Sequence, residues 1–147
     1  MKALIIYDSL YGNTEKIAKA IGEGLGEEAK VIKVSEAKAA DIAPYFYIII
    51  GSPTQRGRPT AAMKTFLDSL PDDVFKGKRL AAFDTRAKSF IVKLLGWAGT
   101  RIEAAVRAKY GNIIAPPKGF FVQGTQGPLA EGEEKRAAEW GKHLATR

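Results

Sequence analysis

Cysteine is absent from this sequence of 147 residues. The absence excludes disulfide bonds, thiolate metal sites and a nucleophilic thiol. It also excludes redox chemistry carried by a pair of thiols. Any redox role of this chain would therefore require a bound cofactor.

Histidine is nearly absent as well, since His143 is the only one. It falls near the end of the last predicted helix, where a surface role or an interaction with the helix dipole is usual. A single imidazole without a thiol cannot build a histidine-rich metal site or a catalytic triad. We therefore expect no metal and no catalytic side chain.

Long apolar runs are also missing, because none approaches the 18 or so residues of a membrane-spanning helix. The chain enters a predicted strand at Ala3 without the pattern of a signal peptide. Its content of 46% hydrophobic and 27% charged residues is typical of a soluble globular protein. We expect a cytoplasmic protein with one domain over residues 1–147 and no membrane span.

Two familiar nucleotide-binding motifs are missing, namely G-x-x-x-x-G-K-[ST] and G-x-G-x-x-G. In their place residues 9–14 read S-L-Y-G-N-T, directly after the apolar run Ala3–Tyr7. A helical pattern follows at once, with Ile17, Ile21 and Leu25 on one face. A loop between a strand and a helix aims backbone N–H groups and the positive end of the helix dipole at one point. This placement predicts a phosphate site.

The residue types of this loop suit an anion. Gly12 permits a positive φ, and the side chains of Ser9, Asn13 and Thr14 can donate hydrogen bonds to phosphate oxygens. The alternative is an ordinary turn in which Asn13 or Thr14 caps the helix. We favour the phosphate of a mononucleotide.

Strand and helix signals alternate along the chain. The apolar runs that predict strands are Ala3–Tyr7, Val31–Val34, Tyr45–Ile50, Leu80–Phe83 and Ile113–Val122, the last interrupted by Pro116 and Pro117. The runs around Ile5 and Ile49 are apolar at every position, which indicates central strands buried on both faces of a parallel sheet. The pattern predicts a three-layer α/β fold with its ligand at the carboxyl ends of the strands, after Tyr7, Ile50 and Phe83.

Three further helices fill the gaps between these strands. Their predicted inner faces are Met63, Phe66, Leu67 and Leu70, then Ile102, Val106 and Tyr110, and finally Ala137, Trp140 and Leu144. Gly111 is predicted to be the left-handed residue that ends the second of them. The last follows Gly127-Pro128 and begins with acidic residues, as the helix dipole favours.

Three segments together resemble the short-chain flavodoxins over nearly the whole length. They are S-L-Y-G-N-T at 9–14, G-S-P-T-Q-R-G-R-P-T at 51–60 and F-D-T-R at 83–86. The resemblance implies a doubly wound, five-stranded parallel sheet in the order 2-1-3-4-5, with FMN at its carboxyl edge. It also implies that the first segment binds the phosphate, while the other two flank the isoalloxazine ring.

The resemblance carries over to particular residues. Those implied to bind the phosphate are Ser9, Leu10, Tyr11, Gly12, Asn13 and Thr14. Those implied to line the ring are Pro53, Thr54, Gln55, Arg56 and Gly57 on one side and Asp84, Thr85 and Arg86 on the other. Gly57 would supply a peptide whose carbonyl can turn toward the ring, since glycine makes such a turn cheap.

The chain departs from the family pattern in its aromatic residues. No aromatic residue stands in Ser52–Arg58, and the third loop offers only Phe90 and Trp97 as stacking partners for the ring. Phe90 also belongs to an apolar cluster, with Ile91, Leu94 and Leu95, whose spacing favours packing on a helix face. Without stacking, FMN affinity would depend mainly on the phosphate loop.

The second departure is the formal net charge of +7 in a family that is generally acidic. Four cationic residues fall in the proposed flavin loops, Arg56, Arg58, Arg86 and Lys88. Positive charge favours the anionic, fully reduced flavin and steers acidic partners to the site. The basic residues are scattered without aromatic interleaving, so we expect redox partner proteins with acidic docking surfaces and no nucleic acid.

Three functions follow from the resemblance. The preferred one is an electron carrier that uses FMN to pass single electrons between proteins. The second is an FMN-dependent reductase of a quinone or another small acceptor, and the third is a regulatory or interaction protein that has lost FMN. A phosphoacceptor receiver is excluded because Gly51 and Ser52 stand where its carboxylate would be, and a tyrosine phosphatase is excluded for lack of cysteine. We take a monomer as the default state.

Overall fold

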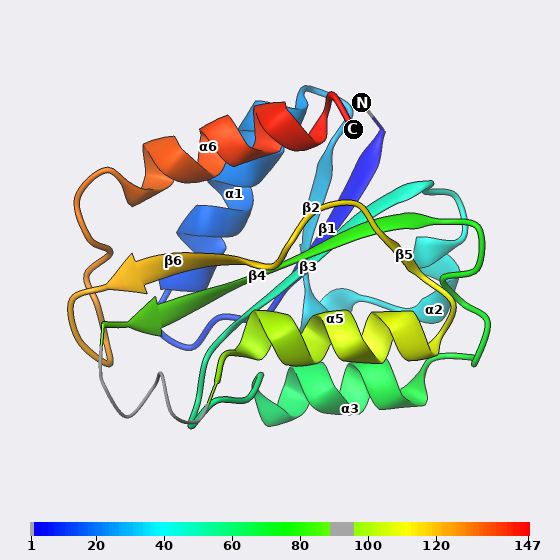
Figure 1. Ribbon diagram of the computed structural model, residues 1–147, viewed down its shortest axis with the longest axis horizontal. Helices are drawn as coiled ribbons and strands as arrows, with labels where there is room; N and C mark the ends of the chain where they lie inside the picture. Colours follow the sequence, from blue (N-terminus) through cyan, green and yellow to red (C-terminus); the bar gives the residue numbers. More distant parts are fainter. Residues whose placement is uncertain (1, 89–95) are drawn as a thin grey trace.

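The computed structural model describes residues 2–88 and 96–147. A single sheet runs through the middle of the molecule, with helices on both faces (Figure 1). The apolar cluster predicted around Phe90 and Leu94 lies outside the described residues.

All strand pairs within the sheet are parallel. The strands are β1 (Ala3–Tyr7), β2 (Lys30–Lys33), β3 (Tyr47–Pro53), β4 (Arg79–Ala87), β5 (Asn112–Ile113) and β6 (Lys118–Val122). Their order is β2-β1-β3-β4-β5, with β6 also paired to β4, which confirms the predicted order 2-1-3-4-5. The last predicted strand is split in two, because Pro116 and Pro117 have no N–H to donate to a sheet.

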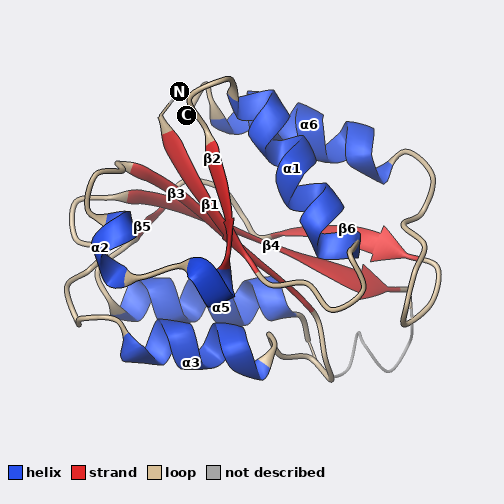
Figure 2. Cartoon of the chain, turned by 180° about the vertical axis from the view of Figure 1, so that it is seen from behind, coloured by secondary structure: helices blue, strands red, loops and turns tan. Residues whose placement is uncertain are grey.

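The helices form two outer layers (Figure 2). They are α1 (Asn13–Leu25), α2 (Ala39–Ile42), α3 (Ala61–Ser69), α5 (Ala98–Ala108) and α6 (Glu133–Leu144), with a 3₁₀ turn at Val34–Glu36. Helices α1 and α6 cover one face of the sheet, whereas α2, α3 and α5 cover the other. The predicted three-layer α/β architecture is therefore confirmed.

The central strand β1 is buried at every position, as its unbroken apolar run predicts. Successive side chains of a strand point to opposite faces, so Ile5 packs with α1 and α6 while Leu4 and Ile6 pack with α3 and α5. This strand therefore holds the start of the first loop in fixed relation to both helix layers.

The two helices of the first face cross at two glycines. A Cβ on Gly141 would lie 2.3 Å from the carbonyl oxygen of Ile21, and one on Gly24 would lie 2.0 Å from that of Ala138. The backbones thus approach more closely than any side chain allows. Beside this crossing, Trp140 packs edge-on against Phe83 and Phe120.

The end of α5 differs from the prediction. The left-handed residue is Tyr110, with φ 67°, and not Gly111. The N–H groups of Tyr110 and Gly111 donate to the carbonyls of Arg107 and Val106, a Schellman ending with tyrosine at its left-handed position. Position 111 requires glycine for another reason, because a Cβ added there would lie 2.4 Å from Cγ1 of Val106.

Candidate functional site

A pocket of about 430 Å³ opens at the carboxyl ends of the strands, within the size range of ligand sites. Its described lining comes from the loops after β1, β3 and β6 and from the last residues of β3, β4 and β6. The predicted site residues that line it are Ser9, Leu10, Tyr11, Asn13, Thr14, Pro53, Thr54, Gln55, Arg56, Thr85 and Arg86. Three predicted residues, Gly12, Gly57 and Asp84, do not line it.

The pocket also has three lining residues that the motifs did not indicate, Ala87, Val122 and Thr125. Val122 and Thr125 lie at the end of β6 and just beyond it. The rule that ligands bind at the carboxyl ends of parallel strands applies to this loop as well. That rule, applied to all strand ends and not only to three, could have found them.

The first loop is held open by backbone geometry. Gly12 precedes α1 with φ 92°, in the left-handed region that favours glycine. Gly12 occupies the N-cap position and the helix begins at Asn13, so the predicted alternative with Asn13 or Thr14 as the N-cap residue is wrong. The first N–H groups of a helix have no partner inside it, and here those of Asn13 and Thr14 have no acceptor among the described residues and remain available to an anion.

Ser9 shapes this loop from the inside. Its Oγ accepts hydrogen bonds from the N–H groups of Gly12 (3.1 Å) and Glu15 (3.4 Å). A hydroxyl that accepts two bonds still has its own proton to donate. Ser9 therefore both curls the loop and presents a donor to the pocket.

The side chains of Asn13 and Thr14 tie the first loop to its neighbours. Asn13 Nδ2 donates to the carbonyl oxygen of Gln126 (3.2 Å), and Thr14 Oγ1 is 2.8 Å from Oγ1 of Thr85. In such a hydroxyl pair one group donates to the other, and the acceptor keeps its own proton for a ligand. The pair is buried, so it joins the first and third loops at the floor of the pocket.

A buried carboxylate lies under the first and second loops. Asp8 accepts hydrogen bonds from the N–H of Ser9 (2.9 Å) and from the hydroxyl of Thr60. Thr60 Oγ1 in turn accepts from the N–H of Met63 and so caps α3. This network fixes the spacing of the first two loops, and sequence reasoning did not assign Asp8 that role.

The second loop is a tight hairpin. Gln55 and Arg58 exchange two backbone hydrogen bonds, of 2.7 Å and 3.0 Å. The two residues between them have positive φ, 50° at Arg56 and 80° at Gly57, the combination of a type I′ turn. Arg101 Nε donates to the carbonyl oxygen of Gly57 (3.2 Å). The hairpin thus presents Gln55 and Arg56 to the pocket while Gly57 bonds to α5.

The third loop contains a bidentate ion pair. Arg86 Nε and Nη2 each donate to an oxygen of Asp84 at 2.7 Å, and the N–H of Gly99 donates to the same carboxylate. Asp84 is fully buried, and the guanidinium of Arg86 stacks on Trp97 at 4.2 Å. The charge of Arg86 is therefore balanced, and Trp97 packs against Arg86.

Two titratable groups connect β1 to α1 behind the pocket. The hydroxyl of Tyr7 donates to Oε1 of Glu15 at 3.0 Å. Burial, with a smaller effect of this carboxylate, raises the pKa of Tyr7 to about 12. Hydrogen bonds from Lys19 and then from Tyr7 lower the pKa of Glu15. Tyr7 therefore stays neutral and Glu15 stays charged at neutral pH.

Within residues 2–88 and 96–147, no group of three or more His, Asp or Glu side chains is arranged to hold a metal ion. Nor does any helix there have the length and apolar character needed to cross a membrane.

Comparison with known proteins assigns the family. The sequence profile described as "Flavodoxin domain" matches residues 4–122. A flavodoxin of Aquifex aeolicus is 33% identical over 105 residues, which cover 67% of this chain and 52% of that protein. An NAD(P)H dehydrogenase (quinone) of Brucella anthropi is 30% identical over 150 residues, covering 86% of this chain and 75% of that protein. The chain thus spans about half the length of the first relative and three quarters of the second.

Solved structures agree with this assignment. A flavodoxin from the domain Archaea superposes with a TM-score of 0.82 over 99% of this chain and 97% of its own, at 24% identity, which shows the common fold. The family profile spans most of the chain and includes the loops after β1 and β3 and the end of β4, all of which line the pocket. The chain belongs to the flavodoxin family.

Proposed function

We propose that this chain binds FMN in the pocket at the carboxyl edge of its sheet and passes single electrons between redox partners. The observation that carries the proposal is the convergence of three loops. Residues 9–11, 13–14, 53–56 and 85–87 belong to three segments that are far apart in the sequence, yet they line one pocket. These are the loops that the motifs related to phosphate and ring binding.

The residues present fit the phosphate end of FMN. The loop offers backbone N–H groups at the start of α1 and the hydroxyls of Ser9 and Thr14. Apart from its chain neighbours, no described residue has an atom within 4 Å of the position that a Cβ on Gly12 would take, so the backbone is open there. A phosphate group could approach this backbone without displacing any part of the chain.

The other two loops would hold the ring. Pro53–Arg56 and Thr85–Ala87 line the pocket from β3 and β4, which pair in register up to Pro53 and Thr85. The N–H of Thr54 donates to the carbonyl oxygen of Thr85 (2.8 Å), which fixes the distance between the two walls. Bound FMN would supply the one-electron chemistry, and the protein would supply orientation and charge.

Arg56 is the side chain best placed to act on the charge of the cofactor. It lines the pocket from the tip of the hairpin, is exposed, and forms no recorded ion pair within the described chain. A cation at this position stabilises negative charge that develops on a reduced cofactor. It would also attract the acidic surface of a partner protein.

A second function is favoured by one relative. The Brucella protein, of which this chain covers 75%, is named as an NAD(P)H dehydrogenase (quinone). A reductase of a quinone or another small acceptor is therefore the alternative, and it requires turnover with NAD(P)H. The proposal also includes a cytoplasmic location and a monomeric state.

One experiment separates the functions. The purified chain is titrated with FMN while the flavin fluorescence and absorbance are followed, and is then reduced stepwise at controlled potential. Stoichiometric binding with two resolved one-electron steps is expected for the carrier. Steady oxidation of NAD(P)H with a quinone would instead establish the reductase, and no binding of FMN would contradict both and leave the regulatory protein.

A further inference from the structure

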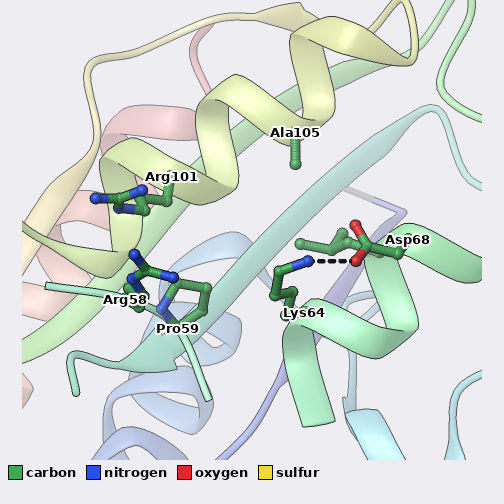
Figure 3. Close-up of a pocket in the computed structure, with 7 residues that line it drawn as sticks. Arg58, Pro59, Lys64, Asp68, Arg101 and Ala105 are labelled. Atoms are coloured by element: carbon green, nitrogen blue, oxygen red, sulfur yellow. Dashed lines mark hydrogen bonds and ion pairs between the residues drawn. The ribbon is translucent and has the colours of Figure 1, made fainter. Parts of the chain in front are cut away.

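A second hollow lies outside the FMN pocket, between α3 and α5 (Figure 3). Its volume is about 190 Å³, below the usual range of sites for whole cofactors. The lining residues are Arg58, Pro59, Lys64, Leu67, Asp68, Arg101 and Ala105. We call this hollow the α3–α5 groove. Its size suits a small ligand or one group of a larger ligand.

The charges that line the groove do not balance. Three cations face one carboxylate. Lys64 Nζ lies 2.6 Å from Oδ2 of Asp68, so these two charges offset each other in an exposed pair. The two guanidinium groups, of Arg58 and Arg101, are then left as the net charge of the groove.

The two arginines lie at the same end of the groove, as Figure 3 shows. Arg101 reaches this end because its Nε donates to the carbonyl oxygen of Gly57, the residue before Arg58. That bond occupies one N–H and leaves both Nη groups of Arg101 to other acceptors. Within the described chain no ion pair is recorded for either side chain. Two like charges held together without a counter-charge favour binding of an anion.

The floor of the groove is apolar. Leu67 of α3 is almost fully buried, and Pro59 and Ala105 are the other apolar residues that line the groove. A free inorganic ion would contact the arginines and leave this floor unused. An oxyanion attached to a short hydrocarbon stem would use both parts, since the stem removes apolar surface from water.

We propose that the α3–α5 groove binds a small organic oxyanion, whose carboxylate or phosphate group pairs with Arg58 and Arg101 and whose apolar stem packs on Pro59, Leu67 and Ala105. The groove is distinct from the FMN pocket, because among the described residues none lines both. Arg101 nevertheless bonds to the hairpin that presents Arg56 to that pocket. The groove thus lies where a bound anion can contact the base of the flavin loop.

The test is a titration followed by ¹H–¹⁵N NMR, on the chain as purified and again with saturating FMN. The probes are butyl phosphate, butyrate and inorganic phosphate, at ionic strength held constant with chloride. Saturable shifts of the backbone signals of Arg58, Lys64 and Ala105 are expected with butyl phosphate and with butyrate. The tighter of these identifies the oxyanion as phosphate or carboxylate, and either result supports the site. Shifts that grow linearly, or that spread over all basic segments, would overturn it.

Two comparisons make the result specific. Inorganic phosphate should bind more weakly than butyl phosphate, and equal affinity would refute the part assigned to the floor. Arg58→Gln and Arg101→Gln should each weaken binding of butyl phosphate by roughly fivefold to tenfold.

Arg107→Gln is the matched control, since it removes the same charge from the same helix at an exposed position that does not line the groove. The affinity of this control should stay within about twofold of the parent. An equal loss in Arg107→Gln would show that only the overall charge matters. If the chain binds butyl phosphate but does not bind FMN, the proposed function is contradicted and the proposal for the groove still holds.

Discussion

Thr14 makes two contributions at the floor of the FMN pocket, since it lines the pocket and its hydroxyl pairs with Thr85. Replacement by valine keeps the shape and removes both the hydroxyl that would contact the proposed phosphate and the pair with Thr85. We expect Thr14→Val to raise the dissociation constant of FMN by roughly tenfold, the usual effect of losing a hydrogen bond to a charged group. Fluorescence titration with FMN measures this effect.

The first loop should contribute more to FMN affinity than the second loop, because the second loop has no aromatic residue that could stack on the flavin ring. Gln55→Ala should therefore weaken FMN binding less than Thr14→Val. Thr100→Val, an exposed position at the start of α5, is the control for loss of a threonine hydroxyl. A dissociation constant for Thr14→Val equal to that of the parent would contradict this prediction.

The four cations predicted near the flavin differ in their position relative to the pocket and in whether a carboxylate balances their charge. Arg58 lines the α3–α5 groove, and the charge of Arg86 is balanced by Asp84. Lys88 does not line the FMN pocket, and its Nζ lies 4.9 Å from the centre of the Phe121 ring. Arg56 remains as the cation that lines the FMN pocket without a recorded counter-charge in the described chain. The basic loops are therefore expected to act on the reduction potential chiefly through Arg56.

Arg56→Gln should lower the potential of the second one-electron step by tens of millivolts. One charge about 7 Å away at an effective dielectric of about 20 gives roughly 100 mV before screening, and Arg56 is exposed. The double variant Asp84→Asn with Arg86→Gln removes a balanced pair and should change the potential little. Potentiometric titration checks both, and equal shifts in the two variants would refute the assignment.

Helix α6 is fixed to the sheet by a charged network around Glu133. The carboxylate accepts from the N–H of Phe121 (2.7 Å) and from Arg136, whose guanidinium also donates to the carbonyl oxygen of Gly119. The hydrogen bond from Arg136 is the main cause of a lowered pKa of Glu133. This network joins α6 to β6, whose end lines the FMN pocket.

The lowered pKa of Glu133 sets the direction of a pH effect. The unfolded chain binds this proton at higher pH than the folded one, so the stabilisation is complete above the ordinary pKa of about 4.3 and is lost as the pH falls further. Glu133→Gln should cost about 2 kcal/mol at pH 7, and the gap from the parent should narrow toward pH 3. Urea unfolding across pH measures it. Glu134→Gln, exposed on the same helix, should show neither effect.

The crossing of α1 and α6 leaves no room for a side chain at Gly141. Gly141→Ala should destabilise the fold by about 2–3 kcal/mol, because its Cβ would have to displace the backbone of α1. Gly124→Ala is the matched control, since its Cβ would meet only ordinary contact at 3.7 Å. Its free energy of unfolding should stay within about 0.5 kcal/mol of the parent. Equal stability of the two variants would mean that the helices can separate at no cost.

The parts of the fold that sequence predicts are those determined by local pattern. Apolar runs such as Ala3–Tyr7 predict buried strands because both of their faces need cover. The sequence pattern predicts Gly111 as the left-handed residue at the end of α5, whereas the structure has Tyr110 there, because glycine at position 111 is required by crowding from Leu80 and Val106 in the folded protein. Contacts distant in sequence decide such details.

The same distinction applies to the site. Motifs indicate the three loops, yet only the fold shows that Asp84 turns inward to bind Arg86 and the N–H of Gly99. Thr125 joins the pocket because β6 lies beside β4, a pairing that carries no motif. Sequence motifs therefore locate the loops of the site, but they do not predict the orientation of a side chain that a buried partner holds.

The formal net charge of +7 concerns the molecule as a whole. At an ionic strength of 0.01 M the screening length is about 30 Å, so the electric field of all the charges reaches beyond the protein surface. At 0.1 M the screening length falls to about 10 Å, and only charged side chains near the site still act on an approaching ion. Electron transfer from the reduced, FMN-loaded protein to ferricyanide, an anion, should therefore slow by roughly tenfold as ionic strength rises over this range and beyond. Transfer to the hexaammineruthenium(III) cation should accelerate.

Stopped-flow measurement with both acceptors tests whether this charge steers anions to the cofactor. Arg56→Gln should reduce the salt dependence with ferricyanide even at high salt, because Arg56 lines the pocket. Arg107→Gln, on the exposed side of α5, should reduce it only at low salt, where distant charges still act. Identical salt profiles for the anionic and cationic acceptors would show that the basic charge has no part in directing partners to the site.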